Sequence, residues 1–555
     1  MGNTITVINN IADKVLNLTL KDVKIDVSDT GGDNFEFEDD QIGKAALSVE
    51  GKGNVEIELD GNNELKSGAS KAGLEKTSTG KLTLKDDNNE AGSLTATGGA
   101  SAAGIGGGFQ GKGENITITG GTVDATGGYG SAGIGGGNGG VGKNITITGG
   151  TVTAAGGFGN AGIGGGNGSD GENITITGGS VTATGGEFAA GIGGSNGGSG
   201  NNITIKGGTV TATGGEGGAG IGGGAEGGGG NNITIKGGTV TATGGGYRGN
   251  SGAGIGGGSS GSGENITIND GKVTATGGNY AAGIGGGSVG AWGGDAGSGK
   301  NITINGGTVN ATGTDGGAGI GGGENGNGED ITINGGKVNA SGAYGGAGIG
   351  GGVNGIGSKV TVSGAAQVTA TATGSGPDWS GVGTGATIGN GGSKTPDGPV
   401  DGKEIQADIS HLTTGYIHHI IYNPDLDSDG KPDGILKEWW EFALPKPIPD
   451  GESLDLHVET LKGAPLPFNT RQQGSTLRVT TDNLSARLHG TRQALETLQE
   501  QGVEQIQFVT TLKTTTLSVA ELLAEGGSWF ALEHDGLGSR RLSAAQAESL
   551  KCWRH

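Results

Sequence analysis

Residues 202–224 read NITIKGGTVTATGGEGGAGIGGG, and the spacing of their apolar side chains decides the fold. Apolar and polar residues alternate, which is the period of a β-strand with one buried face. Gly-Gly pairs at 207–208 and 214–215 interrupt the alternation, and glycine tolerates the positive φ of a tight corner. The stretch therefore predicts three short strands joined by corners. The side chains expected to face inward are Ile203, Ile205, Val210, Ala212 and Ile221.

Near copies of this stretch recur through the middle of the chain at an almost constant step. The isoleucine of the NIT motif recurs with successive differences of 29, 29, 29, 30, 33, 36, 29 and 29 residues. Its positions are 116, 145, 174, 203, 233, 266, 302 and 331, followed by Val360. Such a register indicates a solenoid rather than disorder, and Thr, Val and Gly disfavour helices. We therefore expect a mainly β protein, a parallel β-helix with about 29 residues per coil.

Composition and charge exclude several classes of protein. Glycine supplies 136 of the 555 residues without the three-residue period of collagen. Lys plus Arg number 34 and Asp plus Glu 56, and 34 − 56 gives a net charge of −22. This balance argues against nucleic acid as the main partner. Apolar runs long enough for a membrane span are missing from the sequence, so membrane insertion is not expected. The single cysteine, Cys552, precludes an intrachain disulfide.

An asparagine precedes the first strand of most coils. We expect it to be buried, with its amide paired to corner backbone groups and to the next coil. A ligand-binding role is the less favoured alternative. These residues are Asn115, Asn144, Asn173, Asn202, Asn232, Asn265 and Asn301.

Several motifs resemble those of a known bacterial family. They are NITITGGTVDATGG at 115–128, LNLTLKDVKIDVSDTG at 16–31, NVEIELDGNNELKSG at 54–68 and KLTLKDDNNEAGSLTATGG at 81–99. The chain resembles the clostridial-type cellulose- and pectin-binding surface proteins over roughly residues 1–373. This resemblance implies a right-handed parallel β-helix related to polysaccharide lyases, on the bacterial cell surface or secreted. The N-terminal MGNTITV does not itself have the apolar segment of a secretory signal. Members of the family carry acidic residues near the third strand, linked to calcium, but AGIGGG has none.

The composition divides the chain into four segments. Residues 1–98 are expected to form a cap and irregular starting coils, and 99–373 the Gly/Thr-rich repeats. Residues 374–402 read as a linker, and 403–555 as a small α+β module that includes an Asp-rich loop. Within this module the sequence predicts a helix over 491–502 that stops at Gly502, then a strand in IQFVTTL. SVAELLAEGG predicts a second helix that begins with a Ser518/Glu521 capping box.

The Asp-rich stretch DLDSDGKPDG, residues 425–434, is the sharpest motif for a metal. Carboxylates at alternate positions around a sharp turn, here at Gly430, are typical of calcium loops, with the first three aspartates at positions 1, 3 and 5 and the last at position 9. Position 12 is Leu436 rather than Glu, and Glu438 is a candidate late ligand. The favoured reading is structural calcium, and the alternative is a solvated acidic turn. The candidate ligands are Asp425, Asp427, Asp429, Lys431 and Asp433.

Aromatic residues precede AGIGGG in many coils, and stacked coils would align them along one edge. Exposed rings in a row suit the C–H faces of sugars, so we predict a carbohydrate-binding strip. The alternative, which is favoured for the phenylalanines but not for the tyrosines, is that each ring plugs a glycine-rich corner. The candidate residues are Tyr129, Phe158, Phe188, Tyr247, Tyr280 and Tyr344.

The sequence thus favours a non-catalytic surface or secreted protein that binds a polysaccharide, such as a plant cell-wall or host glycan. Catalytic residues are not identified, because a lyase would need acidic calcium ligands and a Lys or Arg base in one groove. A first alternative is a stalk or adhesin that displays the C-terminal module to a host or cell-surface protein. The second is an ice-binding protein, since outward threonines form ranks at 209/211/213 and 239/241/243. Residues that interrupt these ranks are Asp124, Lys272, Lys337 and Asn339.

Overall fold

The computed structural model divides the chain into two compact units. One comprises Met1–Val362, Ala366–Asp408 and Ile417–Trp440, and the other Ser363–Ala365, Ile409–Tyr416 and Glu441–His555. The residues it describes are 3–32, 42–88, 90–247, 249–289, 296–374, 381–424, 433–442 and 454–550, with the side chain of Tyr247 left out.

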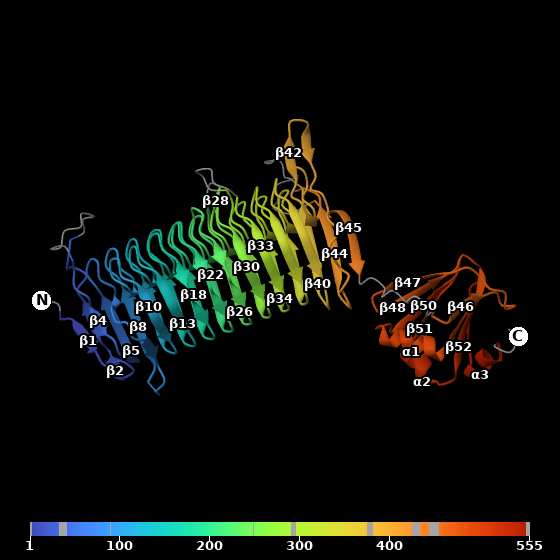
Figure 1. Ribbon diagram of the computed structural model, residues 1–555, viewed down its shortest axis with the longest axis horizontal. Helices are drawn as coiled ribbons and strands as arrows, with labels where there is room; N and C mark the ends of the chain where they lie inside the picture. Colours follow the sequence, from blue (N-terminus) through green and yellow to red (C-terminus); the bar gives the residue numbers. More distant parts are fainter. Residues whose placement is uncertain are drawn as a thin grey trace. The chain divides into compact units, whose positions relative to one another are not determined.

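The first unit is a parallel β-helix, as the repeat predicts (Figure 1). Each coil contributes one short strand to each of three faces, and each strand pairs in parallel with the strand of the next coil. Thr209–Thr213, for example, pairs residue by residue with Ser180–Thr184 on one side and Thr239–Thr243 on the other. The fold expected from the spacing is therefore confirmed.

The first face of the rod begins at the asparagine corner. Its strands are β2 (Val15–Lys21), the first part of β5 (Asn54–Lys66), β7 (Leu82–Lys85), β10 (Gly113–Ile118), β13 (Gly142–Ile147), β16 (Gly171–Glu172), β17 (Thr175–Ile176), β20 (Gly200–Asn201), β21 (Thr204–Ile205), β24 (Gly230–Asn231), β25 (Thr234–Ile235), β30 (Gly263–Ile268), β33 (Gly299–Ile304), β36 (Gly328–Ile333) and β39 (Gly357–Val362).

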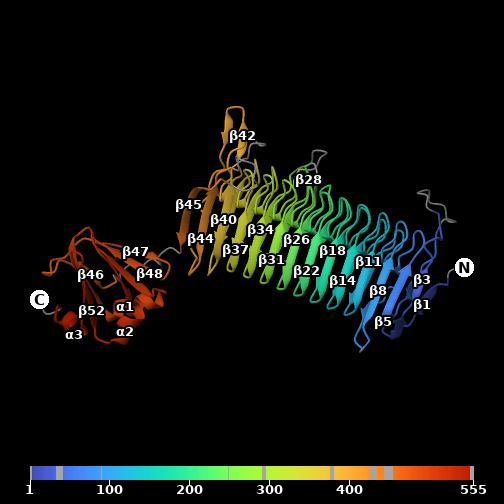
Figure 2. The ribbon, with the colours of Figure 1, turned by 180° about the vertical axis from the view of Figure 1, so that it is seen from behind.

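The second face carries the outward threonines, and Figure 2 shows its strands stacked side by side along the rod. The end of β5 belongs to this face as well, through its pairing with β8. The strands are β3 (Lys24–Asp26), β8 (Gly92–Thr97), β11 (Thr122–Thr126), β14 (Thr151–Ala155), β18 (Ser180–Thr184), β22 (Thr209–Thr213), β26 (Thr239–Thr243), β31 (Lys272–Thr276), β34 (Thr308–Thr312), β37 (Lys337–Ser341) and β40 (Gln367–Thr373).

The third face is a 13-stranded sheet whose repeat strands have only two residues, Ile-Gly. At the inter-strand spacing of ~4.8 Å, its twelve intervals span roughly 58 Å. The strands are β1 (Ile5–Asn9), β4 (Leu47–Gly51), β6 (Leu74–Lys76), β9 (Ile105–Gly106), β12 (Ile134–Gly135), β15 (Ile163–Gly164), β19 (Ile192–Gly193), β23 (Ile221–Gly222), β29 (Ile255–Gly256), β32 (Ile284–Gly285), β35 (Ile320–Gly321), β38 (Ile349–Gly350) and β41 (Ile388–Gly389).

The core of the rod consists of stacks of identical side chains. Ile163 of the third face, for example, lies between Ile134 and Ile192 in the strand register, and all three are fully buried. The inward residues expected from the sequence, including Val210 and Ala212, are also fully buried. Burial of such side chains supplies about 25 cal/mol per Å² of apolar surface, which makes these stacks the main source of stability.

A column of glycines explains how the third face closes so near the axis. The glycine after each third-face isoleucine has a φ between +135° and +143°, which side chains rarely tolerate. A Cβ added at Gly193 would lie 2.0 Å from the carbonyl oxygen of Gly222 in the next coil. The short distance between neighbouring coils therefore requires glycine at this position.

The C-terminal end of the rod differs from the expected boundaries. Ile388, within the predicted linker 374–402, pairs with Ile349 as one more strand of the third face. Residues 417–440, expected in the C-terminal module, belong to the unit of the rod. They include most of β44 (Tyr416–Tyr422) and β45 (Ile435–Phe442). Two small hairpins also project from the coils, β27 (Gly246–Tyr247) with β28 (Asn250–Ser251) and β42 (Ser393–Thr395) with β43 (Gly398–Val400).

The second unit contains a small α+β module, as expected. Its strands form two four-stranded sheets, and one cluster of buried side chains that includes Phe508 and Leu488 forms its core. The sheets contain β46 (Leu456–Glu459), β49 (Ser485–Thr491), β52 (Trp529–Asp535) and β53 (Gly538–Leu542), and β47 (Asn469–Gln473), β48 (Thr476–Thr480), β50 (Gln505–Val509) and β51 (Thr514–Ser518).

The helices of this module begin and end close to where the sequence predicts. They are α1 (Arg492–Glu500), α2 (Val519–Ala524) and α3 (Ala544–Ser549). Helix α1 is followed by Gly502 at φ +78°, the predicted stop. The Ser518 hydroxyl accepts a hydrogen bond from the backbone N–H of Glu521 and so caps α2.

Substitution of the glycine column tests this account of the third face. Gly193→Ala should lower the melting temperature of the rod sharply, because its Cβ would meet the backbone of the next coil. Gly197→Ala is the matched control, since Gly197 also has a positive φ, +72°, but a Cβ there meets nothing within 4 Å. The control should cost about 1 kcal/mol. Equal melting temperatures for the two variants, measured by circular dichroism, would contradict a role for coil spacing.

Candidate functional site

Three of the predicted aromatic residues form a column on consecutive coils. The rings of Tyr129 and Phe158 stack with centroids 5.3 Å apart and planes 3° apart. Phe188 meets Phe158 edge-on, with centroids 5.8 Å apart. Tyr129 and Phe158 remain 50% and 44% exposed, so they do not plug the corner completely. We call Tyr129, Phe158 and Phe188 the aromatic column.

A row of amides lies beside the aromatic column. The loop that follows each third-face strand carries Asn138, Asn167 or Asn196 at equivalent positions on successive coils. Asn196 donates its backbone N–H to the carbonyl of Gly159, the residue after Phe158. A Cβ added at Gly130, the residue after Tyr129, would lie 2.7 Å from Nδ2 of Asn138. The two loops flanking the third face therefore form one ridge, which presents rings and amides side by side. We call Asn138, Asn167 and Asn196 the amide column.

Tyr280 and Tyr344 lie on coils apart from this column. Tyr280 is half-buried, and burial raises the pKa of its hydroxyl, with further contributions from the carboxylates of Asp315 and Glu324. Tyr344 is half-buried on another coil, beyond the coil of Asp315. The side chain of Tyr247 lies outside the described part of the chain. The structure therefore brings together three of the six candidates.

Some aromatic residues of the corner occupy strained backbone positions. Phe188 and Tyr280 have φ values of +70° and +67°. The two coils before Phe188 have a glycine at the equivalent position, Gly130 and Gly159, which also has a positive φ. A bulky side chain in this region costs of order 1–3 kcal/mol, and such strain clusters at binding sites. Ser101, at the same corner of an earlier coil, has a φ of +65°, so the strain belongs to the corner and not to the rings alone.

The asparagines before the first face form a ladder, but on the surface. Asn144 donates its Nδ2 to Oδ1 of Asn115 at 3.0 Å, and Asn173 donates to Asn144 at 3.1 Å. The expected pairing between coils is therefore confirmed, whereas the expected burial is wrong. These asparagines have φ values from +54° to +58°, so the corner turns their side chains toward solvent. Asn115 is half-buried, and the other six are exposed: Asn144, Asn173, Asn202, Asn232, Asn265 and Asn301.

A cavity of about 610 Å³ lies at the N-terminal end of the ridge. It arises where the length of the loop after the third face changes. From Leu74 to Leu82 the chain advances 82 − 74 = 8 positions, whereas from Ile105 to Ile116 it advances 116 − 105 = 11. The longer loop therefore overhangs the shorter one of the preceding coil.

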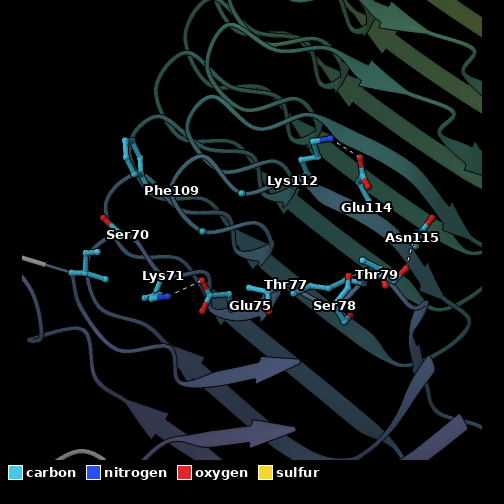
Figure 3. A pocket seen from close by; sticks show the side chains of 14 residues that line it. Ser70, Lys71, Glu75, Thr77, Ser78, Thr79, Phe109, Lys112, Glu114 and Asn115 are labelled. Atoms are coloured by element: carbon cyan, nitrogen blue, oxygen red, sulfur yellow. Dashed lines mark hydrogen bonds and ion pairs between the residues drawn. The ribbon is translucent and has the colours of Figure 1, made fainter. Parts of the chain in front are cut away.

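Charged and aromatic side chains line this cavity (Figure 3). An ion pair joins Lys71 Nζ to Glu75 Oε1 at 3.3 Å, and another joins Lys112 to Glu114 at 3.7 Å. The Lys76 ammonium donates a hydrogen bond to the Ser78 carbonyl at 2.6 Å. The other lining residues are Ile42, Ser70, Thr77, Thr79, Gly108, Phe109, Gly111 and Asn115.

Burial shifts the pKa of two groups in the cavity. Burial lowers the pKa of Lys76 to about 8, although the carboxylate of Glu114 opposes this shift. Burial also raises the pKa of the Glu75 carboxyl, against the effect of Lys71. Because charged groups are costly to bury, Lys76 and Glu75 reduce the stability of the rod in exchange for a polar cavity.

Neither the amide column nor this cavity was predicted from the sequence. The signal for the cavity was present: SKAGLEKTSTGK, at 70–81, replaces a glycine-rich loop with lysines and a glutamate and is three residues shorter. The amides are harder to recognise, because one Asn among glycines is also typical of a turn.

The predicted calcium loop falls largely outside the described residues. Four of the five candidate ligands lie outside the described residues: Asp425, Asp427, Asp429 and Lys431. The fifth, Asp433, is described, and its backbone carbonyl accepts a hydrogen bond from the side-chain amide of Asn423. Glu438, the candidate late ligand, instead contacts His418, with Oε1 and Nε2 2.6 Å apart. Within the described ranges, groups of three or more His, Cys, Asp or Glu suited to a metal ion are not found.

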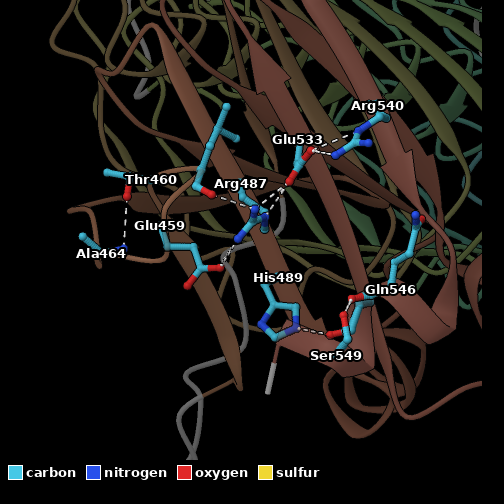
Figure 4. A network of polar contacts seen from close by, with 11 residues as sticks. Glu459, Thr460, Ala464, Arg487, His489, Glu533, Arg540, Gln546 and Ser549 are labelled. Atoms are coloured by element: carbon cyan, nitrogen blue, oxygen red, sulfur yellow. Dashed lines mark hydrogen bonds and ion pairs between the residues drawn. The ribbon is translucent and has the colours of Figure 1, made fainter. Parts of the chain in front are cut away.

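The C-terminal module contains a network of charged side chains on one of its sheets (Figure 4). Arg487 lies between Glu459 and Glu533, at 2.9 and 2.7 Å, and Arg540 contacts the other oxygen of Glu533 at 2.6 Å. Burial would raise the pKa of Glu533, but Arg540 and Arg487 hold it below its ordinary value. Because these charges satisfy one another, the network serves to hold the strands of one sheet together.

Comparison with known proteins agrees with the fold. The profile of a family described as "Beta helix repeat" matches residues 90–109, 116–138, 145–167, 174–198, 203–225, 233–259, 266–288, 302–324 and 331–353. These segments contain the aromatic and amide columns. Matches were found neither among curated proteins nor among solved structures. In the described residues, helices long and apolar enough to cross a membrane are also not found.

Removal of the buried charge of Lys76 should stabilise the rod. Between pH 8 and 10.5 the unfolded chain binds a proton that folded Lys76 has lost, so stability rises with pH across this window. Lys76→Met should remove this rise and increase the free energy of unfolding at pH 7 by up to about 3 kcal/mol. Melting temperatures at pH 7 and 10 measure both effects. Lys143→Met, which removes a partly exposed lysine outside the cavity, is the control. The same pH response in both variants would refute the assignment.

Proposed function

We propose that the protein is a non-catalytic polysaccharide-binding protein that holds an extended glycan along the ridge. The aromatic column would contact the apolar faces and edges of the sugar rings, and the amide column would hydrogen-bond their hydroxyl groups. The observation that carries this proposal is the side-by-side arrangement of rings and amides on three consecutive coils, in which Tyr129, Phe158 and Asn167 are exposed and the other three residues are half-buried.

The periodicity of the ridge supports a polymeric ligand. A solenoid presents the same groups at every coil, ~4.8 Å apart, and a polysaccharide presents the same groups at every sugar. Successive weak contacts along one chain add up, which lets a shallow surface bind without a deep cleft. The proposal accordingly includes an extracellular or cell-surface location, where such polymers are found.

The proposal assigns the ridge to binding rather than catalysis. Phe158, Phe188 and the neutral amides do not transfer protons at ordinary pH, and together with the Tyr129 ring they match the contacts that sugars make.

A stalk that displays the C-terminal module is the second candidate. It is favoured by the independent core of that module, in which Phe508 and Leu488 are fully buried. Ice binding has less support from the second face. Asp124 is paired in register with Thr95 and Thr153, and Lys272 with Thr239 and Thr308. The charges therefore lie within the threonine ranks and interrupt a flat array.

Substitution within the aromatic column tests the binding proposal. Phe158→Ala should weaken polysaccharide binding about two- to tenfold, because it removes a ring worth about 0.5–1.5 kcal/mol per contact. Affinity electrophoresis in gels with soluble pectin, xylan or cellulose derivatives measures this change. Tyr344→Ala, on a separate coil, is the control and should leave binding unchanged.

The same variants distinguish binding from packing. Loss of the Phe158 ring also removes two contacts between coils, so some decrease in melting temperature is expected. A lower melting temperature with unchanged retardation in every gel would leave the column with a packing role only. If wild-type protein is retarded by none of the glycans, the stalk becomes the better reading.

We further propose that calcium binds the Asp-rich loop as a structural ion. Most of β44 and most of β45, the strands on either side of the loop, belong to the unit of the rod, so calcium should stabilise that unit. Excess calcium should raise the rod's stability by about 2.7 kcal/mol at 100 times Kd, and Asp427→Ala should abolish this gain. Thermal scans with calcium and with a chelator test the effect, and Asp482→Ala in the other unit is the control. Wild-type curves that coincide under both conditions would mean that the aspartates are merely solvated.

A further inference from the structure

We infer that the cavity at the N-terminal end of the ridge binds a sugar that carries a single carboxylate, at the terminus of a glycan. Its walls are the overhanging loop with Phe109 and Lys112, and the short loop with Lys76 and Ser78. This inference rests on the proposed function in one respect only, namely that the ligand is a sugar. The cavity is a separate site from the aromatic column.

The charges of the lining favour an anion. Three ammonium groups, those of Lys71, Lys76 and Lys112, face two carboxylates, those of Glu75 and Glu114. With all five groups ionised, the lining carries a net charge of 3 − 2 = +1. The whole chain carries a net charge of −22, so three lysines gathered around one cavity are a local exception that would attract an anion.

Two buried polar groups have hydrogen-bonding capacity for such a ligand. The hydroxyl oxygen of Ser78 is buried and, among the described residues, has no hydrogen-bond partner. Lys76 is 3% exposed as a residue, and its ammonium has three N–H donors, one of which bonds to the Ser78 carbonyl. Buried polar groups in this state are costly, and a ligand carboxylate would accept from both.

The remaining lining favours a sugar over a simple inorganic anion. A cavity of about 610 Å³ is in the size range of small-molecule sites and is far larger than a bare ion needs. The Phe109 ring provides an apolar surface, while Ser70, Thr77 and Asn115 provide hydroxyl and amide groups. This mixture of one aromatic ring and several hydrogen-bonding groups fits a pyranose ring.

The backbone of the overhang is built around the buried carboxylate. A Cβ added at Gly108 would lie 2.5 Å from Oε1 of Glu75. The backbone N–H of Phe109 donates to the carbonyl of Ser70 on the preceding coil. The loop is thus held directly over Glu75, which fixes the position of the Phe109 side of the cavity.

Isothermal titration of the full-length protein with monosaccharides tests the inference. Glucuronate and N-acetylneuraminate, the two sources of a sugar carboxylate, are compared with glucose and with acetate. At least one acidic sugar should bind about tenfold or more tightly than both glucose and acetate, because a charge-assisted hydrogen bond and the ring contacts act together. If only one of them binds, that result identifies the kind of acidic sugar. Equal affinity for glucuronate, N-acetylneuraminate and glucose would overturn the inference, and so would equal affinity for these acids and acetate.

Variants locate the binding to the cavity. Lys112→Ala, which changes a largely exposed side chain, should reduce affinity for the acidic sugar about tenfold, and Lys76→Met should do the same. Lys143→Ala, one coil further along in the register of Glu114, is the matched control and should have no effect. Equal losses for Lys112→Ala and Lys143→Ala would show a general charge effect and refute the site. Because the aromatic column is not altered, polysaccharide retardation in these variants reports separately on the proposed function.

Discussion

The hydrogen-bonded distance between neighbouring coils is the constraint on which the rest of the rod depends. In the strands, each residue of a coil lies about 4.8 Å from its counterpart in the next coil, so each side chain must tolerate a close neighbour that is most often a copy of itself. Isoleucine stacks on isoleucine in the core, and asparagine bonds to asparagine at the corner. Where the backbone itself closes in, only glycine fits, as the contact of Gly193 with Gly222 shows.

This constraint explains what could be predicted from the sequence. The repeat step, the alternation around Ile203 and the Gly-Gly corners all follow from local geometry, and together they determine three faces and a core. Helix α1 and the cap at Ser518 were predictable for the same reason, because their signals are local. The end of the rod was not, since Ile388 joins the third face through a pairing with Ile349, 39 residues earlier.

The candidate site was predictable only in part. The positions of Tyr129 and Phe158, five residues before their isoleucines, place them in one column, and their rings do stack. The exposure of the Asn115 ladder could not be inferred, because a positive φ reverses the direction of a side chain without any mark in the spacing. The cavity depends on a difference in loop length between neighbouring coils. Such differences become visible only when coils are compared pair by pair and not with an average repeat.

The register of identical residues also has a consequence for how such a protein can change over generations. Because most strand positions carry the same residue in neighbouring repeat coils, duplication or deletion of one whole repeat coil leaves most contacts between strands with a suitable neighbour. A gene can therefore lengthen the ridge in units of one coil, by unequal recombination, without a new core. The overhang at Phe109 cannot be copied in this way, because it exists only where two kinds of coil meet. The length of the ridge can therefore change while the cavity at its N-terminal end stays a single copy.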